Sequence, residues 1–300
     1  MVALGLAYAG ARFPGPLSLF DNLSNFPVHF GLAFIACAAL FAMQRQAGWA
    51  AAAAAAAVLA LAPVVPWYFG ADAEPDDPQQ HWVKLLVSNV FFENREHKYI
   101  RRLVAAEDPD VVGLVEVTSR WLRELKVLRE TYPYHFESPD EHFVGLALYS
   151  RLPLENAHVL QLPDEPSTPA IAATLKTPGG DVEIVLVHPM SPSDAEFIRR
   201  RNEQIRALAE YVHAAGRPVV IAGDFNLTMW NAGYRPLTDV AELHNARVGH
   251  GVGPTWPSIW RLGVPIDHIL GTQAVQFRNF RVLSDVGSDH LPVFAEFSRR

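Results

Sequence analysis

The first 70 residues of the chain are almost entirely apolar, whereas the later residues alternate between apolar and polar positions as a globular domain does. Residues 28–43 form an apolar run of roughly 16 residues and residues 47–70 one of roughly 24, where about 20 are needed to cross a bilayer. The pattern predicts a membrane hairpin of two transmembrane helices. Residues 1–10 are apolar but short, and are either the remnant of a third span or an interfacial segment.

A cleaved signal peptide or a buried helical hairpin would also produce apolar runs. A signal peptide is disfavoured because there are two runs and the chain does not start with a basic segment. Arg45 lies between the runs, so the positive-inside rule places this loop in the cytoplasm. We therefore expect a multi-pass protein of the cytoplasmic membrane, with its soluble domain on the outer, periplasmic side.

The composition divides the chain into three parts. Residues 1–70 are the predicted membrane region, and residues 71–81 are acidic, contain proline and lack periodicity, so they read as a linker. Residues 82–300 alternate between short strand patterns and helix patterns. The predicted strands are 84–92, 110–117, 142–150, 170–177, 181–188, 218–226, 266–271, 277–283 and 292–297. Helices are predicted over 93–107, 119–130 and 194–215.

Gly179-Gly180 lies between two strand patterns and predicts a hairpin turn. Tight turns between some strands and helices between others indicate a mixed sheet. A two-layer β-sandwich flanked by helices is one solution for such a pattern.

Polar side chains follow the apolar residues of several predicted strands, at or near the point where each strand ends. These residues are Asn89, Glu116, His188, Asp224, Asn226 and Asp267. Polar groups at strand ends can converge on one rim of a sheet, where binding sites are commonly built. Each residue taken alone also has an ordinary explanation, such as strand-end solvation or an Asx turn.

Two pairs within this set carry specific chemistry. Asp224 and Asn226 alternate along one strand and share a face, so they can hold a water or a hard cation. His290 lies beside an aspartate and can act as a general acid or base near neutral pH, and Asp267 can fix its tautomer. A surface loop and a turn cap are the plainer alternatives. His268 points to the other strand face and is expected to be structural.

Charge and cysteine content limit the function classes. The formal net charge of −7 and pI of about 5.9 disfavour a broad basic groove for duplex nucleic acid. Cys37 is the single cysteine, which excludes an intramolecular disulfide and a thiolate metal cluster. The run Arg199-Arg200-Arg201 is either a local phosphate-binding patch or a solvated helix face.

Seven motifs in order resemble the endonuclease/exonuclease/phosphatase superfamily, also called deoxyribonuclease-I-like. They are SN, PDVVGLVE, GLALYSRLPL, LVHP, GDFN, IDH and GSDHLP, and they span residues 82–298. The succession of two apolar runs, a linker and this domain is similar to membrane-anchored bacterial members. The segment GPTWP at 253–257 resembles that subgroup too.

The resemblance implies an α/β fold, specifically a four-layered α/β/β/α sandwich, here preceded by the N-terminal transmembrane helices. It also implies one or two Mg²⁺ or Mn²⁺ ions. By matching positions, Glu116 is the main metal ligand, assisted by Asn89 and Asp289. Oxygen ligands of this kind suit hard divalent cations.

The resemblance also implies the catalytic roles. Asp224 and Asn226 position or deprotonate the attacking water, and His188 stabilises charge on the phosphoryl oxygens. His290 contacts the phosphate and exchanges a proton, oriented by Asp267. The identity of the general base stays open.

Two positions depart from the family pattern. The residue before the metal glutamate is often Gln and here is Val115, and the residue after the IDH aspartate is commonly Tyr and here is His268. Neither change removes a catalytic group, although both weaken any transfer of substrate identity.

The expected function is a membrane-tethered, metal-dependent phosphoesterase. Its substrate is a nucleic acid or a phospholipid or small phosphoester, and no obligate protein partner is inferred. The alternative is a non-catalytic membrane-bound scaffold that retains the fold.

Overall fold

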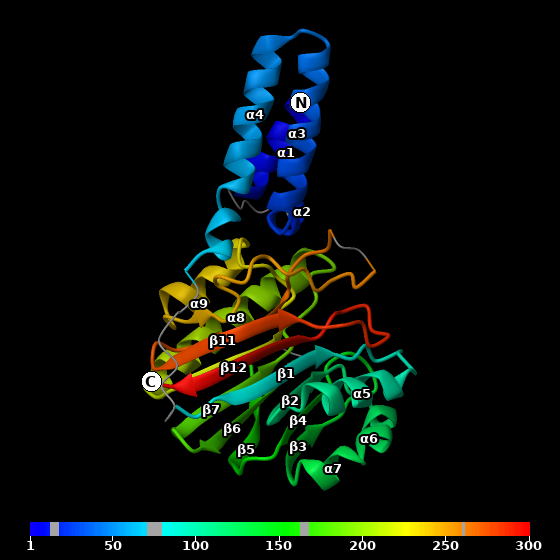
Figure 1. Ribbon diagram of the computed structural model, residues 1–300, viewed down its shortest axis with the longest axis vertical. Helices are drawn as coiled ribbons and strands as arrows, with labels where there is room; N and C mark the ends of the chain where they lie inside the picture. The colour runs from blue at the N-terminus through cyan, green and yellow to red at the C-terminus, as the bar shows by residue number, and fades with distance from the viewer. Residues whose placement is uncertain (13–17, 71–79, 163–167, 260–261) are drawn as a thin grey trace.

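The chain folds into a helical hairpin that stands on one end of a two-sheet α/β domain (Figure 1). The computed structural model describes residues 1–12, 18–70, 80–162, 168–259 and 262–300. The predicted linker at 71–81 falls almost wholly outside the described residues.

Two six-stranded mixed sheets form the centre of the domain. The first has the order β11-β12-β1-β2-β4-β3, built from β1 Val83–Asn89, β2 Val111–Val115, β3 Tyr134–Ser138, β4 Leu146–Ser150, β11 Val275–Val282 and β12 Val293–Arg299. The second has the order β5-β6-β7-β8-β10-β9, built from β5 Leu154–Gln161, β6 Pro169–Thr177, β7 Gly180–Val187, β8 Val219–Asp224, β9 His244–Asn245 and β10 Asp267–Gly271.

Helices cover the outer face of each sheet. Against the first lie α5 His97–Glu107, α6 Ser119–Leu125 and α7 Leu128–Thr131, and against the second lie α8 Ala195–Ala215, η2 Ala232–Tyr234 and α9 Arg235–Asp239. Strand side chains alternate between the layers: Leu85 packs between the sheets and Leu86 packs under the first group of helices. The predicted four-layered α/β/β/α sandwich is therefore confirmed.

All nine predicted strands are present, most with ends shifted by one to three residues. The strand predicted from 142 begins only at Leu146, and the helix predicted over 119–130 is divided into α6 and α7. The predicted turn at Gly179-Gly180 joins β6 to β7 as an antiparallel pair. Strands β3, β5 and β9 were not predicted.

The N-terminal part is helical, as predicted. Its helices are α1 Val2–Arg12, α2 Ser18–Leu23, α3 Pro27–Met43, α4 Ala47–Leu61 and η1 Val65–Tyr68. Helix α3 covers the first apolar run, but α4 covers only part of the second. In the described part of the chain, no helix combines the length and apolar character needed to cross a membrane. The predicted transmembrane helices are therefore not found.

The second apolar run does not form one helix because of its prolines. Helix α4 ends at Leu61, directly before Ala62-Pro63, and Pro66 lies in the short 3₁₀ turn η1. Proline lacks a backbone N–H and disfavours helical geometry in the residue before it, so a helix seldom continues through it. Residues 47–70 therefore do not form one continuous helix.

The segment after the hairpin attaches it to the domain. The Trp230 indole N–H donates to the Pro63 carbonyl at 3.1 Å, and the Trp67 carbonyl accepts from the backbone N–H groups of Gly249 and Gly251. Trp67 also packs against the core cluster beneath α8. The hairpin thus leaves the domain through a hydrogen-bonded and packed junction.

Candidate active site

The polar strand ends meet at one edge of the sandwich because of how the strands pair. β1 runs parallel to β2 with Asn89 opposite Val115, so Glu116 follows beside Asn89. β7 runs parallel to β8 with Val187 opposite Gly223, which places His188 beside Asp224. The antiparallel strand β10 begins at Asp267, directly opposite Asp224. The polar residues at the strand ends of both sheets therefore lie at the same edge of the sandwich.

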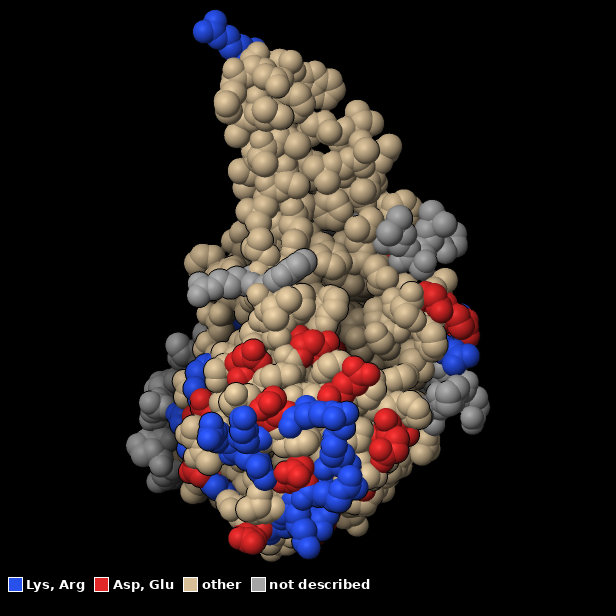
Figure 2. Space-filling model, turned by 90° about the vertical axis from the view of Figure 1, so that its right-hand side faces the viewer, with Lys and Arg blue, Asp and Glu red and all other residues tan. Residues whose placement is uncertain are grey.

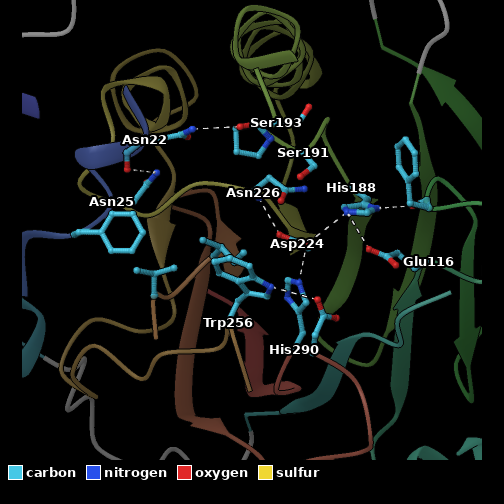
Figure 3. A pocket seen from close by; sticks show the side chains of 16 residues that line it. Asn22, Asn25, Glu116, His188, Ser191, Ser193, Asp224, Asn226, Trp256 and His290 are labelled. Atoms are coloured by element: carbon cyan, nitrogen blue, oxygen red, sulfur yellow. Dashed lines mark hydrogen bonds and ion pairs between the residues drawn. The ribbon is translucent and has the colours of Figure 1, made fainter. Parts of the chain in front are cut away.

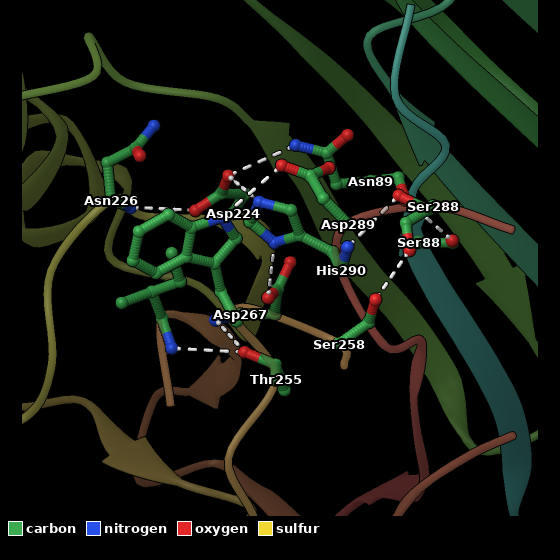
Figure 4. Close-up of polar contacts among 12 residues, drawn as sticks. Ser88, Asn89, Asp224, Asn226, Thr255, Ser258, Asp267, Ser288, Asp289 and His290 are labelled. Carbon is green, nitrogen blue, oxygen red and sulfur yellow. Dashed lines mark hydrogen bonds and ion pairs between the residues drawn. The ribbon is translucent and has the colours of Figure 1, made fainter. Parts of the chain in front are cut away.

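Asp224 is the centre of this group (Figure 4). Its Oδ2 accepts from Asn89 Nδ2 at 3.2 Å and lies 3.4 Å from His188 Nε2 and 3.6 Å from His290 Nε2. Its Oδ1 accepts from the Asn226 backbone N–H at 2.8 Å. Although burial opposes ionisation, the charge of His290 and the hydrogen bond from His188 lower the pKa of Asp224 to about 2. Asp224 is therefore a carboxylate at neutral pH.

The loop after β8 needs an unusual backbone. Gly223 has φ +150°, and a Cβ at this position would lie 1.9 Å from the Val187 carbonyl oxygen. Glycine alone permits this close approach of β7 and β8. Asn226 follows with φ +54°, and its side-chain amide donates to the Pro189 carbonyl at 3.0 Å. The GDFN motif thus bends the chain after β8, so the predicted alternation of Asp224 and Asn226 along one strand is wrong: the backbone N–H of Asn226, and not its side chain, meets Asp224.

His188 is buried and held by its backbone contact. Its Nδ1 donates to the Phe143 carbonyl at 2.8 Å, which leaves Nε2 facing Asp224 and, at 3.8 Å, Glu116. Burial alone would lower the pKa of His188, but the hydrogen bond and charge of Asp224, together with the charge of Glu116, raise it above its usual value. A protonated imidazole here can stabilise an anionic phosphoryl group.

His290 and Asp267 form the predicted pair. His290 Nδ1 donates to Asp267 Oδ2 at 2.9 Å, and both side chains are buried. Thr255 Oγ1 accepts from the backbone N–H of Asp267, which fixes the start of β10. Burial disfavours the charged ring, but Asp267 and then Asp224 outweigh it and raise the pKa of His290 to about 10.

Glu116 and Asp289 present carboxylate oxygens to the same pocket and fit a hard cation. Burial raises the pKa of Glu116 above its usual value, so its charged form lacks a sufficient counter-charge. One oxygen of Asp289 accepts from the Trp256 indole N–H at 3.3 Å, while the other, Oδ1, is buried without a hydrogen-bond partner. Buried carboxylates of this kind are stabilised by a cation.

The side chain of Asn89 makes hydrogen bonds within the protein. Its Oδ1 accepts from the Phe91 backbone N–H, and its Nδ2 donates to Glu116 Oε1 at 2.8 Å. In this arrangement Asn89 orients Glu116, and its role as a metal ligand stays a prediction. Asp224, Asp267 and His290 also lie close enough together to hold an ion. However, the bond from His290 to Asp267 already uses two of their atoms, and a nitrogen ligand suits Mg²⁺ less well.

A sequence model of the Endonuclease/Exonuclease/phosphatase family matches residues 86–290, which contain every one of the predicted site residues. The chain belongs to this family. Solved structures of the same fold include an endonuclease/exonuclease/phosphatase from Beutenbergia cavernae, 23% identical, with a TM-score of 0.60 over 73% of this chain and 72% of that chain. D. rerio TDP2 complexed with a single-stranded DNA product is 18% identical, with a TM-score of 0.61 over 72% of this chain and 98% of that chain.

Two further similar proteins are matched over very different shares of their own length. The mannosyl-6-phosphatase of Bacteroides thetaiotaomicron is 17% identical, with a TM-score of 0.60 over 72% of this chain and 99% of that chain. The protein cwh43 of Schizosaccharomyces pombe is 31% identical over 156 residues, or 49% of this chain. The match spans 15% of the length of cwh43.

In this endonuclease/exonuclease/phosphatase member, the N-terminal helices also contribute to the site, which the sequence did not indicate. Asn22, Asn25 and Phe26 line the same pocket as His188 and His290 (Figure 3). They come from α2 and from the segment that leads into α3.

The place of Arg201 was also missed. Arg199 and Arg200 form exposed ion pairs with Glu196, as a solvated helix face would, but Arg201 is fully buried. Its guanidinium donates to Asp21 Oδ2 at 2.8 Å and to the Asn226 carbonyl at 3.0 Å.

The position of Arg201 in the helical repeat already indicated that its side chain is buried. Arg201 falls on the apolar stripe of α8 that contains Ile198, Ile205 and Leu208. A charged residue on a buried stripe requires a partner, although the spacing does not say which one.

We expect Asp21→Ala to destabilise the full chain by about 3–5 kcal/mol, because it leaves the buried Arg201 guanidinium without its carboxylate. Urea unfolding of the purified protein measures this loss. Glu196→Ala, which removes exposed ion pairs, is the matched control and should leave the unfolding midpoint almost unchanged. Equal unfolding midpoints for the two variants would show that the buried pair does not hold the N-terminal helices to the domain.

Proposed function

We propose that this chain is a divalent-metal-dependent phosphoesterase that hydrolyses phosphodiester or phosphomonoester bonds by attack of water. The observation that carries the proposal is the convergence of Asp224, two histidines and the under-compensated carboxylates of Glu116 and Asp289 in one pocket. Support also comes from the neighbours of the same fold, which include a complex with a DNA product and a mannosyl-6-phosphatase.

Glu116 and Asp289, oriented by Asn89 and Trp256, are the proposed ligands of Mg²⁺ or Mn²⁺. When bound, such a cation supplies Lewis-acid stabilisation of the negative charge on the phosphoryl oxygens. The donor set favours a hard cation because it offers carboxylate oxygens and contains no cysteine.

The remaining residues act on the water and the phosphate. Asp224 accepts a hydrogen bond from the attacking water, and Asn226 keeps the Asp224 carboxylate in place through its backbone N–H. His188 Nε2 and His290 Nε2 both lie near Asp224 Oδ2, so a phosphoryl oxygen bound beside this carboxylate can accept hydrogen bonds from both rings. Asp267 holds the ring of His290.

The test is turnover of bis-(p-nitrophenyl) phosphate by the full-length protein in detergent, with Mg²⁺, with Mn²⁺ and with EDTA. The proposal predicts release of p-nitrophenol with either metal and none with the chelator. A non-catalytic scaffold of the same fold would bind metal without any turnover, and that result would exclude the enzyme.

We further propose that the helical hairpin inserts into a membrane and holds the domain at its surface. Met43 is 81% exposed and Val58 68% exposed, and Arg45 is the one charged residue between Pro27 and Leu61. In Figure 2 the hairpin is a tan column with charge at its tip, whereas Lys, Arg, Asp and Glu gather on the domain. Apolar surface of this extent marks an interaction site, and a bilayer matches its lack of charge.

The proposed location is the outer side of the cytoplasmic membrane, because Arg45 at the hairpin tip favours the cytoplasmic side. A C-terminal alkaline-phosphatase fusion should then be active, and a C-terminal fluorescent-protein fusion exported the same way should be dark. The reverse pattern would place the domain in the cytoplasm, and the chemistry of the site would be unaffected.

A further inference from the structure

The active-site pocket is built jointly by the domain and by the N-terminal helices. It is a cavity of about 540 Å³ whose lining includes Asn22, Asn25 and Phe26 beside the catalytic His188 and His290 (Figure 3). A pocket of this size accommodates a small-molecule group rather than a long polymer. The helices that carry the apolar hairpin therefore form one wall of the place where the phosphoester binds.

This wall is fixed to the catalytic loop by buried polar contacts. Asn25 Oδ1 accepts from both the backbone N–H and the hydroxyl of Thr228, each at 3.0 Å. Asn22 Nδ2 donates to the Pro192 carbonyl at 3.2 Å, and Asp21 pairs with the buried Arg201. The wall is thus a built part of the pocket, because its residues and those of the GDFN loop share hydrogen bonds.

The lining of the pocket combines charged, uncharged polar and apolar side chains. Carboxylates and histidines surround Asp224, Asn22, Asn25, Ser191 and Ser193 add uncharged polar groups, and the apolar members include Phe26, Phe143, Trp256, Val264 and Ile266. None of the described lining residues is Lys or Arg. A nucleic-acid strand needs cations along its run of phosphates, so this pocket suits one phosphate group attached to an apolar group.

The apolar lining of the pocket meets the hairpin at Phe26. Phe26 directly precedes Pro27, the first residue of α3, and packs against the apolar cluster of the hairpin. From there α3 presents Leu32, Ile35 and Leu40, each more than two-fifths exposed. A molecule with its phosphate at Asp224 can thus place its apolar part against Phe26, which lies at the base of the hairpin.

We infer that the substrate is an amphipathic phosphoester of the phospholipid type, taken from the bilayer that the hairpin enters, with its head group in the pocket and its acyl chains towards α3. The inference rests on the proposed phosphoesterase function and adds the substrate class. Its structural basis is the shared wall of Asn22, Asn25 and Phe26.

The experiment compares two sets of substrates for the full-length protein with Mg²⁺. One is vesicles of phosphatidylcholine, phosphatidylethanolamine, phosphatidylglycerol and phosphatidylinositol, and the other is the dibutyryl forms of the same four lipids. Hydrolysis is followed by phosphorus NMR, and single-stranded DNA and bis-(p-nitrophenyl) phosphate are included. We expect the long-chain lipids to be hydrolysed with at least tenfold higher kcat/KM than their short-chain forms.

Variants of Phe26 test whether the wall causes the difference in kcat/KM between long-chain and short-chain lipids. Phe26→Ser should lower the long-chain to short-chain ratio at least tenfold, whereas Phe26→Leu, which keeps an apolar side chain, should keep the ratio. Val127→Ser, an exposed apolar residue beside α7, is the remote control.

Three outcomes would overturn the inference. Equal rates on long-chain and short-chain lipids would remove the role of the acyl chains, and faster turnover of DNA than of any lipid would assign a nucleic-acid substrate. Both leave the phosphoesterase function standing. Failure to hydrolyse bis-(p-nitrophenyl) phosphate or any other substrate with metal would instead reject the proposed function together with the inference.

Discussion

Replacing Glu116 by Gln is expected to lower metal-dependent kcat by about 10³-fold or more, which corresponds to the several kcal/mol that a Lewis-acidic cation contributes. The side chain directly follows the apolar strand β2 and lines the candidate active-site pocket. Gln has nearly the same shape but lacks the negative charge that attracts a divalent cation. Turnover of bis-(p-nitrophenyl) phosphate across a Mn²⁺ titration, with Mn²⁺ binding measured by calorimetry, gives both the rate and the affinity.

The fold should tolerate this change. Burial raises the pKa of Glu116, so the folded state loses little when the charge is removed. Gln keeps an acceptor for the Phe92 backbone N–H but loses the one for Asn89 Nδ2, which still donates to Asp224 Oδ2. Glu210→Gln, on the exposed face of α8, is the matched control and should behave as the unmodified protein. Full activity of Glu116→Gln at saturating Mn²⁺ would reject the assignment of Glu116 as a metal ligand.

The fold, and the residues that gather at the candidate site, could be predicted from the sequence because both depend on local patterns. An apolar strand that ends in a polar side chain, as at Asn89, Glu116 or His188, is visible in a few consecutive residues. Parallel pairing then brings such ends to one edge, whatever the remaining connections are. The motifs GDFN, IDH and GSDHLP, in that order, also predicted which residues lie next to these strand ends.

The missed strands lack such a pattern. β3 Tyr134–Ser138 and β5 Leu154–Gln161 lie at the ends of their sheets and expose much of their length. An edge strand with one solvated side carries little apolar alternation, so the sequence offers no strand period there.

The joint wall of the pocket could not be predicted for a different reason. Asp21 and Arg201 lie 180 positions apart, and Asn25 and Thr228 lie 203 positions apart. Neither Asp21 nor Asn25 belongs to a catalytic motif, and a single sequence gives no signal for a pair at such a separation. Arg201 alone showed that a partner must exist, because a buried guanidinium needs an acceptor.

His290 and Asp267 are expected to act as one unit. The carboxylate accepts the Nδ1–H of the ring at 2.9 Å, which leaves Nε2 directed at Asp224 Oδ2. Without Asp267 the imidazole can take the other tautomer and loses the anion that stabilises its protonated form. Each single variant, His290→Ala and Asp267→Ala, should therefore lose much of the same rate, about 10²–10⁴-fold for a general acid or base.

The double variant decides whether the two losses share a cause. If the pair is coupled, removing both residues lowers kcat little further than removing His290 alone, because Asp267 then has no ring left to orient. The comparison uses kcat at saturating metal for the four proteins of the cycle, with His213→Ala, an exposed histidine near the end of α8, as the control. Losses that multiply would mean that Asp267 acts independently of His290, as a structural residue at the start of β10.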